Sequence, residues 1–482
     1  MQDTYEFLII GSGAGGAAAA HRLVEAGRSV LLLEKGSELP DDGSTLDPRL
    51  VAGGHFNSKE VWNDVRGDAF MPEEHFNLGG KTRWYGAALL RNDPHEFAAD
   101  AALGLRAWPF DYAEFEPHYR EAEQLLGVHH FDNEADLQRI AADLNRSGWQ
   151  THPLQLGLST QIVEHLREAT HFDGYAVPNG LKSDAKYRLL EPLRARANLS
   201  LVMNATVRDL LPADGDALRI AGVRCSDGRE YFAGTVLLAA GAMHSPRLLQ
   251  RYFLSTGLTE RLPAAGSVGR NFKRHILTAV IGFGWRIKRD RICKTALFLH
   301  DDFPHSSSQP LGGWADRETI RVLLPGFLPK WLVEFFALRA YGFFLQTEDG
   351  SHADNRVIGE SGESGESGDD TRPTLDYRAE RNPELAREHR GMVRSFMTAM
   401  LRAGLIPFKQ SIGLSGMAHC GGTLIAGSDP ETSVVDGNGK VHGMQNLYVV
   451  DGSVLPRLGR MNPALSIYAW ALRTARHLLA TG

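Results

Sequence analysis

The first 34 residues alternate short apolar runs with a glycine-rich break. Residues 7–10 are apolar, GSGAGG follows at 11–16, and the alanine-rich stretch after it ends at Gly27. Such a run predicts a buried strand, and the stretch behind it is a strong helix former closed by glycine. Residues 29–33 predict a second strand that ends at Glu34. The pattern therefore predicts a strand, turn, helix and strand, the start of an α/β fold.

The last 40 residues show a related pattern. Residues 447–450 are apolar β-formers that predict a buried strand, and Asp451-Gly452 predicts its turn. Pro463 suits the first position of a helix, and the apolar residues of ALSIYAWALRTARHLL are spaced for one. The free N–H groups of this helix would point at whatever lies in front of Asn462.

No stretch predicts a membrane span. The nearest candidate, 323–346, is interrupted by two prolines and three charged residues. Its aromatic side chains predict a place in the core, with a substrate lid or a subunit contact as the alternative. These aromatics are Trp331, Phe335, Phe336, Tyr341, Phe343 and Phe344.

Composition limits the class of protein. The 482 residues exceed one ordinary domain and fit two interleaved ones, and 43% hydrophobic with 23% charged residues is typical of a soluble globular protein. The net charge of −6, without a basic block, excludes nucleic acid as the expected partner. Cys225, Cys293 and Cys420 are too few and too scattered for a disulfide framework or a metal site. With no room for a signal segment before the first strand, we expect a cytoplasmic enzyme that holds no metal.

The N-terminal unit predicts a dinucleotide site. Its glycines allow a tight turn, close contact with a pyrophosphate and dense helix packing, while Glu34 at the end of the second strand can bind a ribose hydroxyl. An acid at this position fits NAD or FAD and argues against a 2′-phosphate.

Further motifs recur along the chain in a fixed order. They are GSGAGG with Glu34, LGGKTRWYGAA, NATV at 204–207, GAMHSPRLL, VGRNFKRH, HCGGT from His419, NLYVVDGSVLP and MNPALS. Together they resemble the glucose-methanol-choline (GMC) oxidoreductase family. The resemblance implies a discontinuous Rossmann-like FAD-binding domain (1–100, 200–275 and 412–482). It also implies an inserted substrate domain (101–199 and 276–411) built on an antiparallel sheet that faces the flavin.

The resemblance also implies the cofactor contacts. Around the glycine motif they are Gly11, Ser12, Gly13, Ala14, Gly16, Glu34 and Lys35, with the backbone near Val207 at the adenine. Gly80, Thr82, Tyr85, Gly86 and Ala87 would border the flavin, and Asp451, Gly452, Asn462, Pro463 and Ala464 would hold its ribityl and pyrimidine side. Relatives that bind flavin covalently carry histidine before the tryptophan of this loop, where this chain has Arg83. We therefore expect non-covalent FAD. Tyr85 departs from the family's usual asparagine, and GTLIAG at 422–427 departs from its usual GTxRMG.

The resemblance also implies that His419 is the catalytic base. An alcohol gives up hydride readily only when its hydroxyl proton is removed, and a histidine titrates close to neutrality. Asn462 matches the partner position and could hydrogen-bond the substrate hydroxyl. The other histidines are expected to have no such role.

We expect FAD-dependent oxidation of a primary or secondary alcohol of a small polar substrate, such as a sugar or amino sugar, with O2 or a quinone-like acceptor. The alternatives are an FAD-containing lyase of the hydroxynitrile-lyase type, a lipophilic (sterol-like) alcohol oxidase, and a flavin-binding protein without catalysis. Glu348 is a candidate substrate contact, with a solvated loop acid as the other interpretation. The acidic GESGESGES loop (359–367) would favour a cationic substrate if it lies at the entrance.

Overall fold

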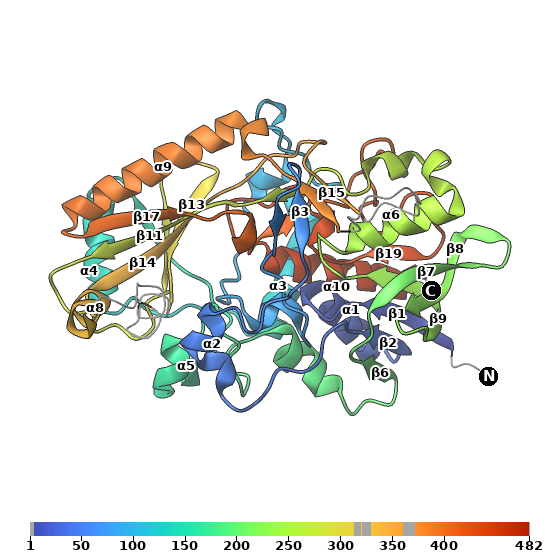
Figure 1. Ribbon diagram of the computed structural model, residues 1–482, viewed down its shortest axis with the longest axis horizontal. Coiled ribbons are helices and arrows are strands. Elements are labelled where there is room, and N and C mark those ends of the chain that lie inside the picture. The colour runs from blue at the N-terminus through green and yellow to red at the C-terminus, as the bar shows by residue number, and fades with distance from the viewer. Residues whose placement is uncertain (1–3, 313–319, 321–328, 360–371, 482) are drawn as a thin grey trace.

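The computed structural model describes residues 4–312, 320, 329–359 and 372–481. Two large sheets lie toward opposite ends of an elongated molecule (Figure 1). One is mainly parallel and the other is antiparallel, as expected for a mixed α/β chain. Residues 360–367 of the acidic loop lie outside the described part of the chain.

The first sheet has seven strands in the order β6-β2-β1-β9-β8-β7, with β19 beside β9. Five strands pair in parallel: β1 (Thr4–Ile10), β2 (Val30–Leu33), β6 (Leu199–Val202), β9 (Glu230–Leu238) and β19 (Leu447–Val449). At one edge, β7 (Val207–Ala213) and β8 (Asp216–Cys225) form an antiparallel hairpin, and β8 pairs with β9. In β1, Ile9 is aligned with Leu32 on one side and Leu237 on the other, and all three side chains are buried. This confirms the predicted Rossmann-like arrangement.

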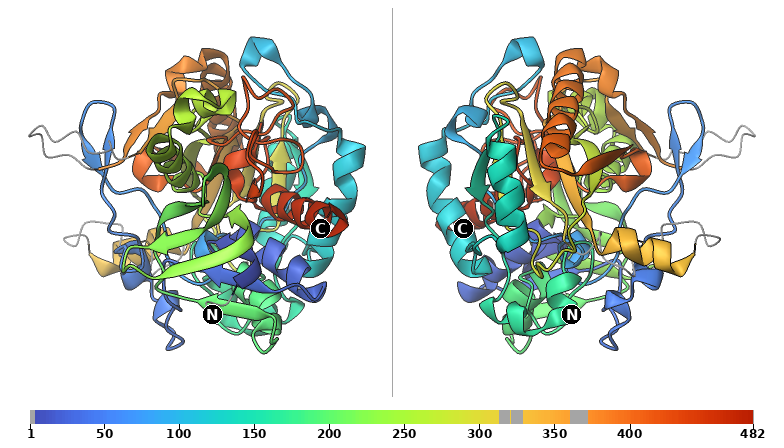
Figure 2. Two further views of the ribbon diagram at one scale, coloured as in Figure 1. Left: turned by 90° about the vertical axis from the view of Figure 1, so that its right-hand side faces the viewer. Right: turned by 90° about the vertical axis from the view of Figure 1, so that its left-hand side faces the viewer.

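Helices cover this sheet. α1 (Ala14–Glu25) and the C-terminal α10 (Ala464–Thr481) lie side by side, and α3 (Tyr112–Leu126) packs on α10 (Figure 2). The alanines at 17–20 of α1 are fully buried, so their small side chains let the two long helices approach closely. α6 (Ser245–Thr256) packs against β7.

The second sheet is antiparallel, in the order β17-β11-β14-β13-β12-β5. Its strands are β5 (Gln150–Pro153), β11 (Ile276–Phe283), β12 (Ala296–Leu299), β13 (Ser306–Pro310), β14 (Ala340–Thr347) and β17 (Ile406–Ser411). The long helix α9 (Pro383–Arg402) packs across it, with α4 (Ala135–Asn145) beside α9 (Figure 2). Every strand of this sheet comes from the ranges predicted for the substrate domain.

Smaller elements connect the two sheets. A four-stranded sheet contains β3 (Trp62–Asp64), β4 (Ala69–Phe70), β15 (Arg356–Ile358) and β16 (Thr374–Asp376). The short strands β10 (Lys273–Arg274) and β18 (Cys420–Gly421) pair with each other. The short helices α2 (Pro48–Ala52) and α5 (Leu166–Thr170) both lie at the lower edge of the view in Figure 1.

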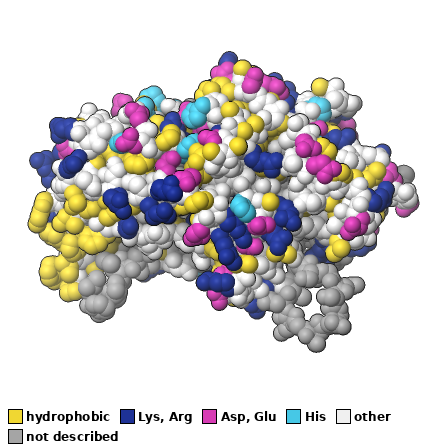
Figure 3. All heavy atoms as spheres, turned by 90° about the horizontal axis from the view of Figure 1, so that it is seen from above, with side chains coloured by type: hydrophobic (Ala, Val, Ile, Leu, Met, Phe, Trp, Pro, Cys, Tyr) yellow, Lys and Arg dark blue, Asp and Glu magenta, His cyan; other side chains and the backbone are white. Residues whose placement is uncertain are grey.

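The described aromatic side chains of the segment 323–346 include a buried and an exposed group. Tyr341 and Phe343 of β14 are buried as predicted, but Trp331, Phe335 and Phe336 of α8 (Lys330–Ala337) are exposed, Trp331 by 69%. α8 buries only one face, through Val333 and Ala337, so the prediction of a core position was wrong for its other side chains. These aromatics contribute to the apolar surface in Figure 3. No helix in the described part of the chain is long and apolar enough to cross a bilayer.

Candidate functional site

The site begins where the parallel strands end. β1, β2, β9 and β19 all finish at one edge of the first sheet, so Gly11, Glu34, Ala239 and Asp451 come together there. A crevice outside the carboxyl ends of parallel strands is where such sheets bind nucleotides.

The glycine motif leaves room for a ligand at one position and packs tightly at the others. A Cβ on Gly15 would lie 1.8 Å from the carbonyl oxygen of Val450, and one on Gly16 would lie 1.9 Å from that of Gly11. A Cβ on Gly13, by contrast, would meet nothing within 4 Å. Gly13 is also the N-cap of α1 and supplies no capping side chain. The space beside this uncapped helix start is therefore open, as a pyrophosphate site requires.

Glu34 is held at the end of β2. Its Oε2 accepts hydrogen bonds from the N–H and hydroxyl of Ser12 (3.0 and 2.5 Å), and its Oε1 accepts from the N–H of Gly36 (2.8 Å). Burial raises the pKa of Glu34, although these hydrogen bonds oppose that shift. A carboxylate has about four acceptor positions, so one remains for a ribose hydroxyl.

Of the other two residues expected around the ADP half, Val207 lies near Glu34, whereas the side chain of Lys35 points to other partners. The Ala205 N–H donates to the Glu34 carbonyl (2.9 Å), which brings the chain leading into Val207 beside the acid. Lys35 instead places its ammonium 3.7 Å from the centre of the Phe76 ring and 3.5 Å from Glu60.

The loop at 77–87 closes over the glycine motif. A Cβ on Gly80 would lie 3.3 Å from the Cα of Gly13, and the Gly79 N–H donates to the Ser12 hydroxyl (2.9 Å). The Thr82 hydroxyl donates to the Gly79 carbonyl (2.6 Å), and Tyr85 donates to the carbonyl of Ser183 (2.6 Å). The loop ends at Gly86 and at Ala87, which has a φ of +50°. These contacts fix the loop that is expected to border the flavin.

Asp451 ties two strand ends together. Its carboxylate accepts from the Gly241 N–H (2.8 Å), the Ser245 hydroxyl (2.5 Å) and the Ser453 N–H (2.9 Å), and burial raises its pKa. The loop after Gly452 leads to Asn462, Pro463 and the first residue of α10, Ala464. The helix begins one residue later than predicted.

His419 and Asn462 face each other. The amide nitrogen of Asn462 lies 3.3 Å from Nε2 of His419, and Gln309 of β13 donates to Asn462 Oδ1 (2.7 Å). Because Oδ1 is already an acceptor for Gln309, the Asn462 amide must turn its NH2 group toward His419. The motif comparison paired His419 with Asn462, but nothing in the sequence indicated Gln309.

A second histidine fixes the protonation of the first. His275 is completely buried, its Nε2 lies 2.7 Å from the carbonyl oxygen of Gly459, and its Nδ1 lies 2.9 Å from His419 Nδ1. A carbonyl only accepts, so His275 carries its proton on Nε2 and presents a bare Nδ1. His419 must then donate from Nδ1, which leaves its Nε2 unprotonated beside Asn462.

The pKa values agree with this assignment. Burial lowers the pKa of His275 to about 4. Burial, followed by His275 and the cations Lys294, Lys81 and Arg274, holds the pKa of His419 well below its ordinary value. Both rings are therefore neutral near pH 7, and Nε2 of His419 can accept a proton.

Glu348 lies beneath this network. It is fully buried, so the interpretation as a solvated loop acid was wrong. Its two oxygens accept from Nε and Nη2 of Arg457 (3.0 and 2.6 Å), and Oε1 also accepts from the Gly459 N–H (3.0 Å). Glu348 therefore holds Gly459, whose carbonyl orients His275. A direct contact between Glu348 and the substrate stays a prediction.

Replacing Arg457 by methionine is expected to destabilise the protein by about 3–5 kcal/mol, because it leaves the buried Glu348 carboxylate unpaired. Urea unfolding followed by tryptophan fluorescence would measure this. Arg66→Met, which removes an exposed ion pair with Asp64, is the control and should change stability little. Equal stability of the Arg457 variant and the wild type would show that the buried pair has no such role.

The residues at this edge fit FAD. The uncapped start of α1 with the open space at Gly13 suits the pyrophosphate, and Glu34 suits a ribose. The loop at 77–87 and the start of α10 would enclose the ring system. FAD bound by these residues would supply an acceptor for the hydride of an alcohol carbon.

Comparison with known proteins agrees with this arrangement. Two family models, both described as GMC oxidoreductase, match residues 5–277 and 378–471. The chain is 29% identical over 529 residues to the 6'''-hydroxyparomomycin C oxidase of Streptomyces lividus, and 30% identical over 516 residues to the Paromamine 6'-oxidase of Streptomyces fradiae. Each alignment covers 98% of this chain and 91% of the relative.

Solved structures share the fold. Pyridoxine 4-oxidase from Mesorbium loti superposes with a TM-score of 0.70 at 19% identity, covering 99% of this chain and all of that one. A variant of the formate oxidase of Aspergillus oryzae gives 0.69 at 16% identity, covering 100% and 99%.

Proposed function

Because the chain belongs to the GMC oxidoreductases, a family of FAD-dependent enzymes that oxidise alcohols, we propose that its substrate is a small sugar that carries amino groups. A CH–OH group of this sugar is oxidised to the aldehyde or ketone, with FAD held non-covalently. The observation behind the catalytic assignment is the chain of contacts from the Gly459 carbonyl through His275 to His419, which leaves Nε2 of His419 unprotonated beside the amide of Asn462.

The chain's own residues supply the proton chemistry. Nε2 of His419 removes the hydroxyl proton of the substrate. The Asn462 NH2 group, whose contact with His419 is long at 3.3 Å, turns to the substrate oxygen and stabilises its developing negative charge. Gln309 keeps that amide in the required orientation.

The second sheet offers polar groups beside this pair. Gln309 and Gln346 are buried, and the amide of Gln346 donates to the Arg460 carbonyl (2.9 Å), two residues from Asn462. Neither glutamine's Oε1 has a hydrogen-bond partner among the described residues. Buried acceptors without partners favour a ligand rich in N–H and O–H groups. They support a sugar over a sterol-like alcohol.

The two aligned oxidases that act on aminated sugars support the amino groups of the substrate. Because both are named oxidases, we propose O2 as the electron acceptor, with hydrogen peroxide as the expected product. Cys225, Cys293 and Cys420 are all unpaired, which supports a reducing compartment such as the cytoplasm.

An anaerobic screen tests the substrate. Paromamine, a single-ring amino sugar, choline, a sterol and mandelonitrile would each be mixed with the purified enzyme, and the flavin absorbance followed. We expect the amino sugars to bleach the flavin fastest. Bleaching by choline or the sterol alone would refute the proposed substrate, and aldehyde release from mandelonitrile without bleaching would indicate a lyase.

A further inference from the structure

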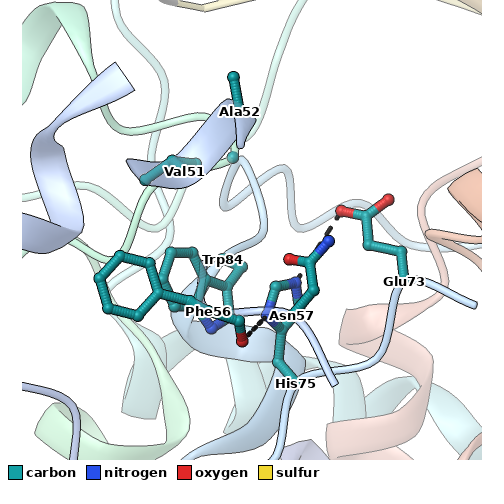
Figure 4. Close-up of a pocket in the computed structure, with 8 residues that line it drawn as sticks. Val51, Ala52, Phe56, Asn57, Glu73, His75 and Trp84 are labelled. Atoms are coloured by element: carbon teal, nitrogen blue, oxygen red, sulfur yellow. Dashed lines mark hydrogen bonds and ion pairs between the residues drawn. The ribbon is translucent and has the colours of Figure 1, made fainter. Parts of the chain in front are cut away.

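A pocket of about 170 Å³ is lined by residues of α2, by the segments around 56–57 and 73–75, by Gly174 and by Trp84 of the loop at 77–87 (Figure 4). Val51 and Ala52 of α2 form one side, and Phe56 and Trp84 form the other. None of the catalytic steps described above uses these residues.

Ring contacts and hydrogen bonds hold the aromatic side of the pocket together. The Phe56 and Trp84 rings lie 5.2 Å apart, and His75 stacks on Trp84 at 4.7 Å. The Trp84 indole donates to Asn77 Oδ1 (3.0 Å), and His75 Nδ1 lies 3.2 Å from the Phe56 carbonyl oxygen. Such a preformed aromatic surface binds the C–H face of a sugar ring or a cation at little entropic cost.

The polar side of the pocket carries a carboxylate without a strong cationic partner. Two nearby acids are neutralised: Glu60 pairs with Arg247 (2.8 Å) and Glu74 with Lys81 (2.6 Å). Glu73 lies 3.9 Å from Nε2 of His75 and also interacts electrostatically with Lys81, but no lysine or arginine lies within ion-pair distance of it in the described part of the chain. A carboxylate beside aromatic faces recognises an ammonium group, and the Asn57 amide beside it can serve a hydroxyl (Figure 4).

Two contacts join the lining of the pocket to segments that lead to the site. The Glu73 N–H donates to the carbonyl of Ser415 (2.9 Å), four residues before His419 and hence within about 14 Å of it along the chain. On the other side Gly174 follows Asp173, whose Oδ1 would lie 2.1 Å from a Cβ placed on Gly86 of the flavin loop. A second sugar ring attached to the ring being oxidised would extend from His419 toward this segment.

We propose that this pocket binds the second, amine-bearing ring of a two-ring substrate. Glu73 pairs with an ammonium group of that ring, and Phe56 and Trp84 cover its apolar face. The inference rests on the proposed oxidation of amino sugars and names the part of the enzyme that selects their second ring.

The test compares paromamine, which has two aminated rings, with methyl glucosaminide, which has one. The ratio of their kcat/KM values would be measured for the wild type, Glu73→Gln, Phe56→Leu and the control Glu431→Gln, whose exposed acid lies outside the pocket. We expect Glu73→Gln to lower the ratio by about tenfold or more, chiefly through KM for paromamine, because it removes a charge-assisted contact. Phe56→Leu should lower the ratio to a smaller extent, and the control should leave it unchanged.

Binding of 2-deoxystreptamine to the FAD-loaded enzyme, measured by calorimetry, gives an independent result. It should weaken in the Glu73 and Phe56 variants. An unchanged ratio and unchanged binding would overturn the inference, while bleaching of the flavin by methyl glucosaminide would still support the proposed function. Loss of bound FAD in both variants would show that Glu73 and Phe56 contact the flavin, and it would also overturn the inference. Failure of both sugars to reduce the wild-type flavin would refute the proposed function itself.

Discussion

Replacing His419 by alanine is expected to slow flavin reduction by about two to four orders of magnitude while leaving FAD bound. The variant loses the bare Nε2 that faces Asn462, so the hydroxyl proton has no acceptor when the hydride leaves. Anaerobic stopped-flow measurement of flavin absorbance would give the rate, and the visible spectrum would give the FAD content. His118→Asn is the matched control, because burial also lowers the pKa of His118 to about 4 but the residue lies on α3.

The pH dependence of flavin reduction by the wild type should reflect the titration of His419. Since burial and nearby cations hold the pKa of His419 well below its ordinary value, the ring is already unprotonated at neutral pH. The rate constant for flavin reduction should therefore stay level from neutral pH into the acidic range and fall only below the ordinary histidine pKa of about 6.5. A midpoint at or above that value, or full activity of the alanine variant, would contradict the assigned role.

Replacing His275 by phenylalanine is expected to slow flavin reduction by about ten- to a hundredfold. His275 is a positioning residue: its Nδ1 accepts the proton of His419 Nδ1 and so keeps the opposite nitrogen bare. Phenylalanine removes that acceptor, and the imidazole of His419 is then free to rotate or to carry its proton on Nε2.

Two further variants separate this role from simple packing. His275→Asn keeps an acceptor oxygen near the position of Nδ1 and should retain most of the activity. His275→Gln can still reach the Gly459 carbonyl but offers no acceptor at that position, so it should resemble phenylalanine. Equal losses in the asparagine and glutamine variants, with unchanged pH profiles, would show that His275 only fills space.

The local parts of the site could be predicted because each is contiguous in the sequence. The glycine motif, Glu34 at the end of β2, and the Asp451-Gly452 turn all lie within single strand–turn units, where composition and spacing determine the conformation. The six-stranded antiparallel sheet followed from the family resemblance, since its strands are drawn from segments scattered over 150–411.

The partners of His419 could not be predicted in this way. His275 was quoted within a motif but given no role, because its contact depends on the pairing of Arg274 with Cys420 in two very short strands. Gln309 lies in a buried run of polar residues that shows no hydrophobic alternation. Glu348 was expected at a substrate or in solvent, yet its partner Arg457 lies 109 residues away. Such long-range pairs leave no local signal.

The central claim is that His419 takes the hydroxyl proton of an alcohol whose carbon delivers hydride to FAD. The most direct test is anaerobic flavin reduction by an amino sugar deuterated at the carbinol carbon, compared with the unlabelled sugar. The account predicts that both bleach the flavin and that the deuterated sugar does so several times more slowly. Equal rates, or no bleaching with either sugar, would contradict it.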